Sequence, residues 1–318
     1  MRGTSPICRE AARAATEVGG QLPRQSFEVI RSNLEATLEF CRSINLQPDE
    51  SRFAEYRRRL DHLITVVRLR RYDITVGRSV EEELREEGLH YIITLTESTE
   101  FGDILPFLRT CEPNVIRPKL RNVLRGPLLP TDEDADSNQA RNILFELNLA
   151  ARLHRAGLEP VVAEHPDVAC EVDGKWLFFE CKRPFSPGKI SKLITKAARQ
   201  LKSDLAVRPG ARGVVAISLS KVMNAGDRLY TFDQEAEGRL GLADALTRAA
   251  WSFRRAEEKL FGSKIVGMVY HVITPALNRE LDMYYVAQQL EAHPLASHGS
   301  ADYRAFRALG RALEAAQY

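Results

Sequence analysis

Two acids and a lysine are the residues of this chain most able to do chemistry together. Asp167 stands before one apolar run, and Glu180 and Lys182 end the next one. Between the two runs, Asp173-Gly174 is the preferred pair for a two-residue type I′ hairpin turn, in which both central residues have positive φ. With this turn, the register predicts Asp167 directly opposite Glu180, and Lys182 on the same side of the sheet.

Two carboxylates in this position need a compensating charge. Directly opposed residues have Cβ atoms about 5 Å apart, and at an effective dielectric of about 20 the repulsion costs roughly 3 kcal/mol. A divalent cation would remove this cost, and Mg²⁺ commonly uses one or two carboxylates together with waters and substrate phosphate. The alternative is an ordinary exposed strand end. We expect solvated surfaces for the two other acid-x-lysine triplets of the chain, which begin at Asp173 and Glu257.

Pro166-Asp167 followed by Glu180-Cys181-Lys182 at the end of an apolar strand resembles the PD-(D/E)XK nuclease superfamily. The resemblance covers roughly residues 137–220, about a quarter of the chain. It implies an α/β fold with a restriction-endonuclease-like core, in which a mixed central sheet is flanked by helices in the order αβββαβ. It also implies Mg²⁺-dependent hydrolysis of nucleic-acid phosphodiesters, with Mn²⁺ able to substitute, and we expect a DNA endonuclease.

Glu146 is the fourth candidate of this site. A helix is predicted over residues 139–156, ending before Gly157, and Glu146 falls inside its apolar arc between Leu153 and Ala150. An inward carboxylate is costly unless it is paired or coordinates a metal. A glutamate on this helix is what the resemblance implies for the metal site, and the alternative is an internal salt bridge, with Lys182 as the candidate partner.

The roles implied by the resemblance can be assigned residue by residue. The expected catalytic residues are Asp167, Glu180, Lys182 and Glu146. The expected metal ligands are Asp167, Glu180, Glu146 and the backbone carbonyl of Cys181.

A basic segment follows these residues at once. From Lys182 to Arg212 the chain has nine lysines and arginines against one acid, Asp204. A polyanionic nucleic-acid backbone requires such a surface, although a solvated helix face is the alternative. The candidate nucleic-acid contacts are Arg183, Lys189, Lys192, Lys196, Arg199 and Gln200. Gln200 rests on the resemblance, because many relatives carry glutamine or lysine here; Asp204 departs from the Q-x-x-x-Y form that some of them have.

The patterning predicts four segments. Residues 1–125 read as mostly helical, with short strands at 72–76 and 90–95, and they are assigned to packing, dimerisation or recognition. Residues 126–138 combine Gly, two Pro and four acids and read as a linker. Residues 139–275 form the nuclease-like core, with strands expected at 159–164, 213–219 and 264–273. Residues 276–318 read as C-terminal helices.

Composition narrows the class of protein further. The net charge is only +2, and the five cysteines form no C-x-x-C pair, which suits a reducing compartment. The first residues lack the apolar stretch of a signal peptide, and no apolar run reaches the length of a membrane span. We therefore expect a cytoplasmic protein with no membrane partner, which binds DNA rather than RNA and forms a homodimer through its N-terminal helices.

Two other functions stay open. One is an inactive nucleic-acid-binding or regulatory protein on the same fold, and the other is a structural α/β protein that assembles through its N-terminal helices.

Overall fold

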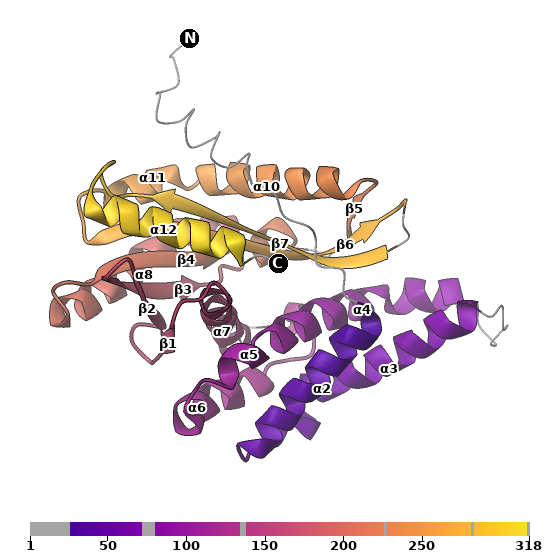
Figure 1. Cartoon of the computed structure of the whole chain (residues 1–318). Helices are drawn as coiled ribbons and strands as arrows, with labels where there is room; N and C mark the ends of the chain where they lie inside the picture. The colour runs from indigo at the N-terminus through magenta and orange to yellow at the C-terminus, as the bar shows by residue number, and fades with distance from the viewer. Residues whose placement is uncertain (1–25, 72–79, 134–137, 226–227, 281–282, 317–318) are drawn as a thin grey trace, which may run out of the picture.

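The computed structural model of the chain describes residues 26–71, 80–133, 138–225, 228–280 and 283–316. Over these ranges the chain forms an α/β architecture, with helices on both faces of a seven-stranded mixed sheet (Figure 1). The α/β class predicted from the sequence is confirmed.

The sheet has the strand order β1-β2-β3-β4-β6-β5, and β7 pairs with β6. β3 is parallel to β4 and β4 is parallel to β6, whereas β2–β3 and β6–β7 are antiparallel. The strands are β1 (Val161–Val162), β2 (Val168–Val172), β3 (Lys175–Lys182), β4 (Arg212–Ser218), β5 (Tyr230–Phe232), β6 (Ile265–Asn278) and β7 (Met283–Pro294).

The hairpin β2–β3 has the predicted turn and register. Asp173 and Gly174 both have positive φ, 48° and 72°, as a type I′ turn requires. Val172 pairs with Lys175 and Ala169 with Phe178. The dipeptide Asp173-Gly174 therefore sets which side chains of β3 share a face.

Helices fill both faces of the sheet and build a bundle beside it. The N-terminal helices are α2 (Phe27–Ser43), α3 (Arg52–Arg71), α4 (Val80–Asp103), α5 (Leu105–Leu108) and α6 (Pro113–Leu124). The others are α7 (Gln139–Arg155), α8 (Pro187–Val207), α9 (Ser220–Met223), α10 (Glu235–Trp251), α11 (Arg254–Glu257) and α12 (Ala301–Ala315), with short 3₁₀ turns at Pro48–Glu50, Pro130–Asp132 and Glu258–Leu260.

The two faces of the sheet belong to two hydrophobic clusters. Phe179 and Cys181 of β3 pack in the cluster that includes α7 and α12. Phe178 of the same strand packs with α8 and α10. A sheet whose parallel strands are covered on both sides reads as nearly continuous apolar sequence, which is why Trp176 to Phe179 has no polar alternation.

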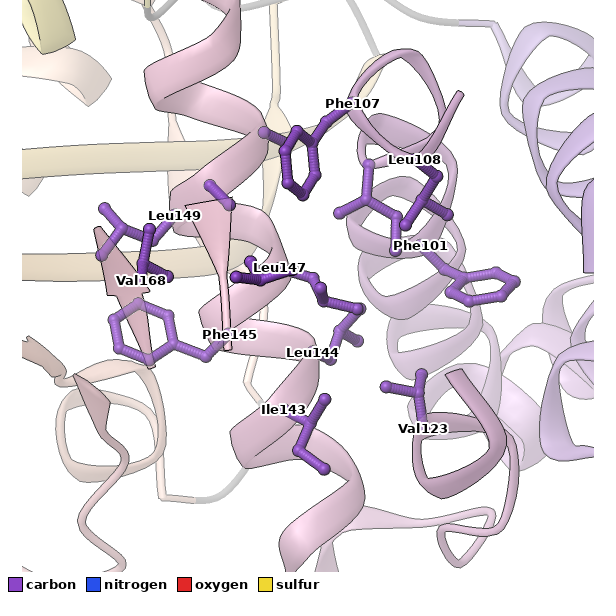
Figure 2. Packing of buried hydrophobic residues seen from close by; sticks show 14 of the residues in the cluster. Phe101, Phe107, Leu108, Val123, Ile143, Leu144, Phe145, Leu147, Leu149 and Val168 are labelled. Atoms are coloured by element: carbon purple, nitrogen blue, oxygen red, sulfur yellow. The ribbon is translucent and has the colours of Figure 1, made fainter. Parts of the chain in front are cut away.

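α7 lies between the sheet and the N-terminal helices. Figure 2 shows it with the strand that carries Val168 on one side and the segments that carry Phe101 and Phe107 on the other. Thirteen of its seventeen residues are buried, because a helix enclosed on all sides has no solvated face. One hydrophobic cluster therefore runs from α2 through α7 to the sheet.

The segment predicted as a linker is packed against this assembly where the structure describes it. The Tyr56 hydroxyl donates to the Leu128 carbonyl at 2.5 Å, and Arg141 Nη2 donates to the Pro127 carbonyl at 3.0 Å. A Cβ on Gly126 would lie 2.6 Å from that of Ala140. Residues 126–133 thus join the N-terminal helices to the core without a free span.

Several predicted elements differ from the structure. Residues 283–294, expected to be helical, form β7, and β6 continues past Pro275 to Asn278. A proline is tolerated at 275 because β6 pairs with β4 only up to His271 and with β5 only from Ala276, so its missing N–H leaves no ladder bond unmade on that side.

Other differences concern the length or type of an element. Residues 90–95, expected to be a strand, belong to α4, since a short apolar run fits a buried helix equally well. The first core strand is only Val161–Val162. The strand expected at residues 72–76 lies outside the described residues.

Candidate active site

Asp167 lies immediately before the first paired residue of β2. The ladder begins at Val168 with Phe179, so one further step in the same register leads to Asp167 and Glu180. The Asp167 carboxylate accepts a hydrogen bond through Oδ2 from the Cys181 backbone N–H at 2.7 Å. Asp167 is therefore held against the end of β3 by the strand's own backbone.

Lys182 is bonded to two oxygens of β3. Its ammonium donates to Glu180 Oε1, and it donates to the Cys181 carbonyl at 3.1 Å. Glu180 is 1% exposed, and its buried Oε2 has no hydrogen-bond partner among the described residues. Burial and the charge of Asp167 raise the pKa of Glu180, although the Lys182 ammonium opposes this. A buried, unpaired carboxylate oxygen leaves a place for a cation or a donor.

Glu146 enters from α7 and pairs with a residue that the sequence did not indicate. Lys119 of α6 donates to Glu146 Oε2 at 2.7 Å. The predicted alternative of an internal salt bridge is thus found, but with Lys119 and not with Lys182. Burial and the charge of Asp167 raise the pKa of Glu146 to about 7, against the opposing charges of Lys119 and Lys182.

These interactions place the four predicted catalytic residues in one electrostatic environment. The charge of Asp167 acts on both Glu146 and Glu180, and Lys182 opposes it at both. Two acids with raised pKa values, Glu146 and Glu180, beside the carboxylate of Asp167 and one lysine, form the kind of cluster that occurs at functional sites.

The oxygens of this cluster suit a hard cation. Asp167, Glu180 and the Cys181 carbonyl supply oxygen donors of the type that Mg²⁺ prefers. Within the described ranges no group of three or more His, Cys, Asp or Glu residues is arranged to hold a metal ion. Glu146 is held by Lys119, and the Lys182 ammonium provides the positive charge next to Glu180. A bound Mg²⁺ would therefore rest on two carboxylates and one carbonyl.

The predicted nucleic-acid contacts are in two environments. Arg183 is 11% exposed and bonds Glu133 at 2.8 Å, but this carboxylate also lies 3.2 Å from Arg141 Nη1, so it offsets only part of the Arg183 charge. The other basic candidates lie exposed on α8: Lys189, Lys192, Lys196 and Arg199. Gln200 is half-buried, and its Oε1 is buried with no hydrogen-bond partner.

Three residues near the site were not among the candidates. Lys119 and Glu133 are far from the motif in sequence, and no local pattern links them to it. Asp204 gave a signal, because it is the single acid of the basic segment. Its charge raises the pKa of Glu180, and burial and Asp167 raise the pKa of Asp204 itself.

Comparison of the chain with protein-family models, with curated proteins and with solved structures gave no match. Among the helices that the structure describes, none is both long and apolar enough to cross a membrane.

Proposed function

We propose that this protein is a metal-dependent nuclease that hydrolyses nucleic-acid phosphodiesters, with DNA as the preferred substrate and Mg²⁺ or Mn²⁺ as cofactor. The observation that carries the proposal is Glu180, a buried carboxylate with one unpaired oxygen, beside Asp167 and Lys182 at the end of β3. Further support comes from the element order α7-β1-β2-β3-α8-β4, which is the αβββαβ order that the resemblance to PD-(D/E)XK nucleases implies. We also propose that the protein is cytoplasmic, because its cysteines form no C-x-x-C pair, which suits a reducing compartment.

The chain's own residues would divide the work as follows. Asp167 and Glu180, with the Cys181 carbonyl, would hold the cation, and the Cys181 N–H keeps Asp167 in place. A bound Mg²⁺ supplies Lewis-acid polarisation of the scissile phosphate. Lys182, released from Glu180 when a cation neutralises that carboxylate, would orient the attacking water and offset charge that develops on the phosphate.

Binding of the substrate would use the exposed face of α8. Lys192, Lys196 and Arg199 are exposed on this helix, and none of them forms an ion pair with an acid of the described residues, whereas Arg183 pairs with Glu133. Contacts of this kind act on phosphates and are insensitive to sequence. The salt dependence of binding should therefore decrease when these residues are removed.

A cleavage panel tests the proposal. Linear and circular duplex DNA, single-stranded DNA and RNA are incubated with Mg²⁺ and the wild-type chain, Asp167→Ala or Lys182→Ala. We expect cleavage by the wild type and a loss of at least about 100-fold in each variant, with the helical circular dichroism unchanged. Lys259→Ala, from an acid-x-lysine triplet whose lysine is exposed, is the matched control and should keep full activity. Equal cleavage by wild type and Lys182→Ala would reject the role of Lys182.

An inactive nucleic-acid-binding protein on the same fold is the second candidate. The observation in its favour is that Lys182 and Lys119 already neutralise Glu180 and Glu146 without a metal. Titration calorimetry with Mn²⁺ separates the two: binding that is lost in Asp167→Asn supports the nuclease, and the absence of binding together with salt-sensitive DNA binding supports the second candidate.

A further inference from the structure

A cavity of about 70 Å³ lies between α4, α7 and the carboxyl ends of β3 and β4. Its walls include Arg183, which follows Lys182, Ser218 at the end of β4, and Ser220 just after it. One water needs about 10–15 Å³ of such space, so several waters or one group the size of a phosphate can enter. In open α/β sheets, ligands bind in the crevice outside the carboxyl ends of the strands. Asp167, Glu180 and Glu146 do not line this cavity, so it is a separate site.

Among the described residues, three cations and two acids line the cavity. The cations are Arg141, Arg183 and Lys221, and the acids are Glu97 and Glu100. Outside this lining, Arg52 bonds Glu97 at 2.9 Å, and Glu133 pairs with Arg141 and Arg183. Arg141 is 3% exposed, and within the described part of the chain its buried Nη1 makes no hydrogen bond, although it lies 3.2 Å from Glu133 Oε1. A buried guanidinium with an unmet donor favours an added anion.

Hydroxyl groups complete the polar wall. Ser218 Oγ and Ser220 Oγ lie 3.2 Å apart, and Ser220 Oγ also accepts the Ile273 N–H at 3.0 Å. One of the two hydroxyl hydrogens forms the hydrogen bond between these two oxygens. The other hydrogen can turn toward a ligand in the cavity.

Protonation of Glu100 removes a negative charge from the wall of the cavity. Burial and the charge of Glu97 raise the pKa of Glu100 to about 7, against the opposing charges of Arg183, Arg152 and Arg141. In its protonated form this carboxyl can donate a hydrogen bond and carries no charge. An anion in the cavity would stabilise that form.

We propose that this cavity binds a phosphate group, held by Arg183, Arg141 and Lys221 with the hydroxyls of Ser218 and Ser220. The site is distinct from the candidate active site and does not require that the chain cleave nucleic acid. The phosphate can belong to a small molecule or to the end of a nucleic-acid strand, because the recognising groups are the same.

Calorimetric titration of the full chain with inorganic phosphate tests the site. We expect binding by the wild type that is weakened about tenfold or more in Lys221→Met, as for the loss of one charged hydrogen bond. Lys259→Met, an exposed lysine far from the cavity walls, should bind as the wild type does. The proposal is overturned if the wild type does not bind phosphate, or if Lys221→Met, shown to be folded by its unchanged thermal transition, binds with wild-type affinity.

The role of Glu100 gives an independent readout. Sulfate keeps its charge between pH 6 and 8, so a change in its affinity reports the protein alone. Sulfate should bind more weakly at pH 8 than at pH 6, because Glu100 ionises as the pH rises through about 7. Glu100→Gln should remove this difference, and an identical pH dependence in that variant would contradict the assignment.

Competition distinguishes the source of the phosphate. A single-stranded oligonucleotide is compared with and without a 5′-phosphate, alongside a nucleoside monophosphate, as a competitor of bound phosphate. Displacement by the phosphorylated oligonucleotide and not by its hydroxyl form assigns the site to strand ends. Displacement by the monophosphate alone assigns it to a small ligand. For either assignment, the competitor must bind to the cavity of the wild type, and its binding must be weakened in Lys221→Met.

Discussion

The ion pair between Lys119 and Glu146 holds the buried side of the candidate active site. Both side chains are nearly buried and their charged atoms lie 2.7 Å apart. Removal of one partner of such a pair leaves an uncompensated charge in a low-dielectric environment, and the cost exceeds the net stabilisation by the pair itself. Lys119 thus opposes the protonation of Glu146, although α6 contributes no other residue to the site.

This pair predicts a pH-dependent change in stability. The folded pKa of Glu146, about 7, is above the usual value of 4.5, so its contribution to stability is fully present below 4.5 and is lost as the pH rises through 7. Lys119→Met should enlarge that loss, lowering the free energy of unfolding by about 2 kcal/mol at pH 8 and much less at pH 5. Urea unfolding at both pH values measures it.

The double variant is the control for this prediction. Lys119→Met combined with Glu146→Gln removes the uncompensated carboxylate and should recover most of the stability at pH 8. The same loss at pH 5 and pH 8, unrelieved in the double variant, would show that packing of the Lys119 side chain and not its charge is the cause.

The sequence indicated those site residues whose positions depend on local geometry. Asp173-Gly174 fixes the hairpin register, and the register brings Asp167, Glu180 and Lys182 to one end of β3. Lys119 and Glu133 reach the same region by tertiary packing, which no spacing in the chain reports. The inward position of Glu146 was predictable from its helical arc, but its partner was not.

At the scale of elements, β6 and β7 are joined to α11 by a polar group of four residues, of which Glu257 and Tyr270 are buried. His293 Nδ1 lies 2.9 Å from Glu257 Oε1, and its Nε2 lies 2.8 Å from Glu291 Oε1. The Tyr270 hydroxyl donates to the same Glu257 oxygen at 2.6 Å. Burial disfavours the imidazolium, but the hydrogen bonds to Glu257 and Glu291 outweigh it and raise the pKa of His293 to about 9.

The stability of the strand pair should depend on this histidine. Its folded pKa is above the unfolded value of about 6.5, so its contribution is fully present below pH 6.5 and is lost as the pH rises through about 9. The wild type should lose about 2 kcal/mol more than His293→Gln between pH 7 and pH 10. His298→Gln, an exposed histidine, should follow the wild type. If the free energies of unfolding of the wild type and His293→Gln changed in parallel with pH, this role of His293 would be contradicted.

β7 is a strand that the sequence did not predict. β2 and β3 were predictable because a two-residue turn and apolar runs are local signals. β7 also follows β6 closely in the chain, but no Asn-Gly or Asp-Gly pair marks the connection, and pairing along nearly the whole of β6 overrides the helical reading of residues 283–294.

At the scale of the whole molecule, a chain of buried ion pairs connects the N-terminal helices to the strand that carries the site. Arg52 of α3 bonds Glu97 of α4 at 2.9 Å, and Glu97 bonds Arg141 of α7 at 2.5 Å. Glu133 then links Arg141, at 3.2 Å, to Arg183 after β3. Because of this network and the shared hydrophobic cluster, we expect the helices and the sheet to unfold as one cooperative unit.

Glu97→Gln tests whether the N-terminal helices and the sheet unfold together. The change leaves two buried arginines without their shared carboxylate and should lower the free energy of unfolding by about 3 kcal/mol. Far-UV circular dichroism reports mainly the helices, whereas both tryptophans, Trp176 and Trp251, lie in the sheet half. The two signals should keep a common midpoint in urea. Early loss of helical signal with unchanged fluorescence would mean that residues 26–125 unfold separately.

The central claim is that Asp167 and Glu180 hold a divalent cation beside Lys182, and a crystal structure of the chain grown with Mn²⁺ tests it most directly. We predict an anomalous scattering peak between the two carboxylates and near the Cys181 carbonyl, with the Lys182 ammonium displaced from Glu180. Carboxylates still bonded to Lys182 and the Cys181 N–H, with no peak between them at saturating Mn²⁺, would contradict the account.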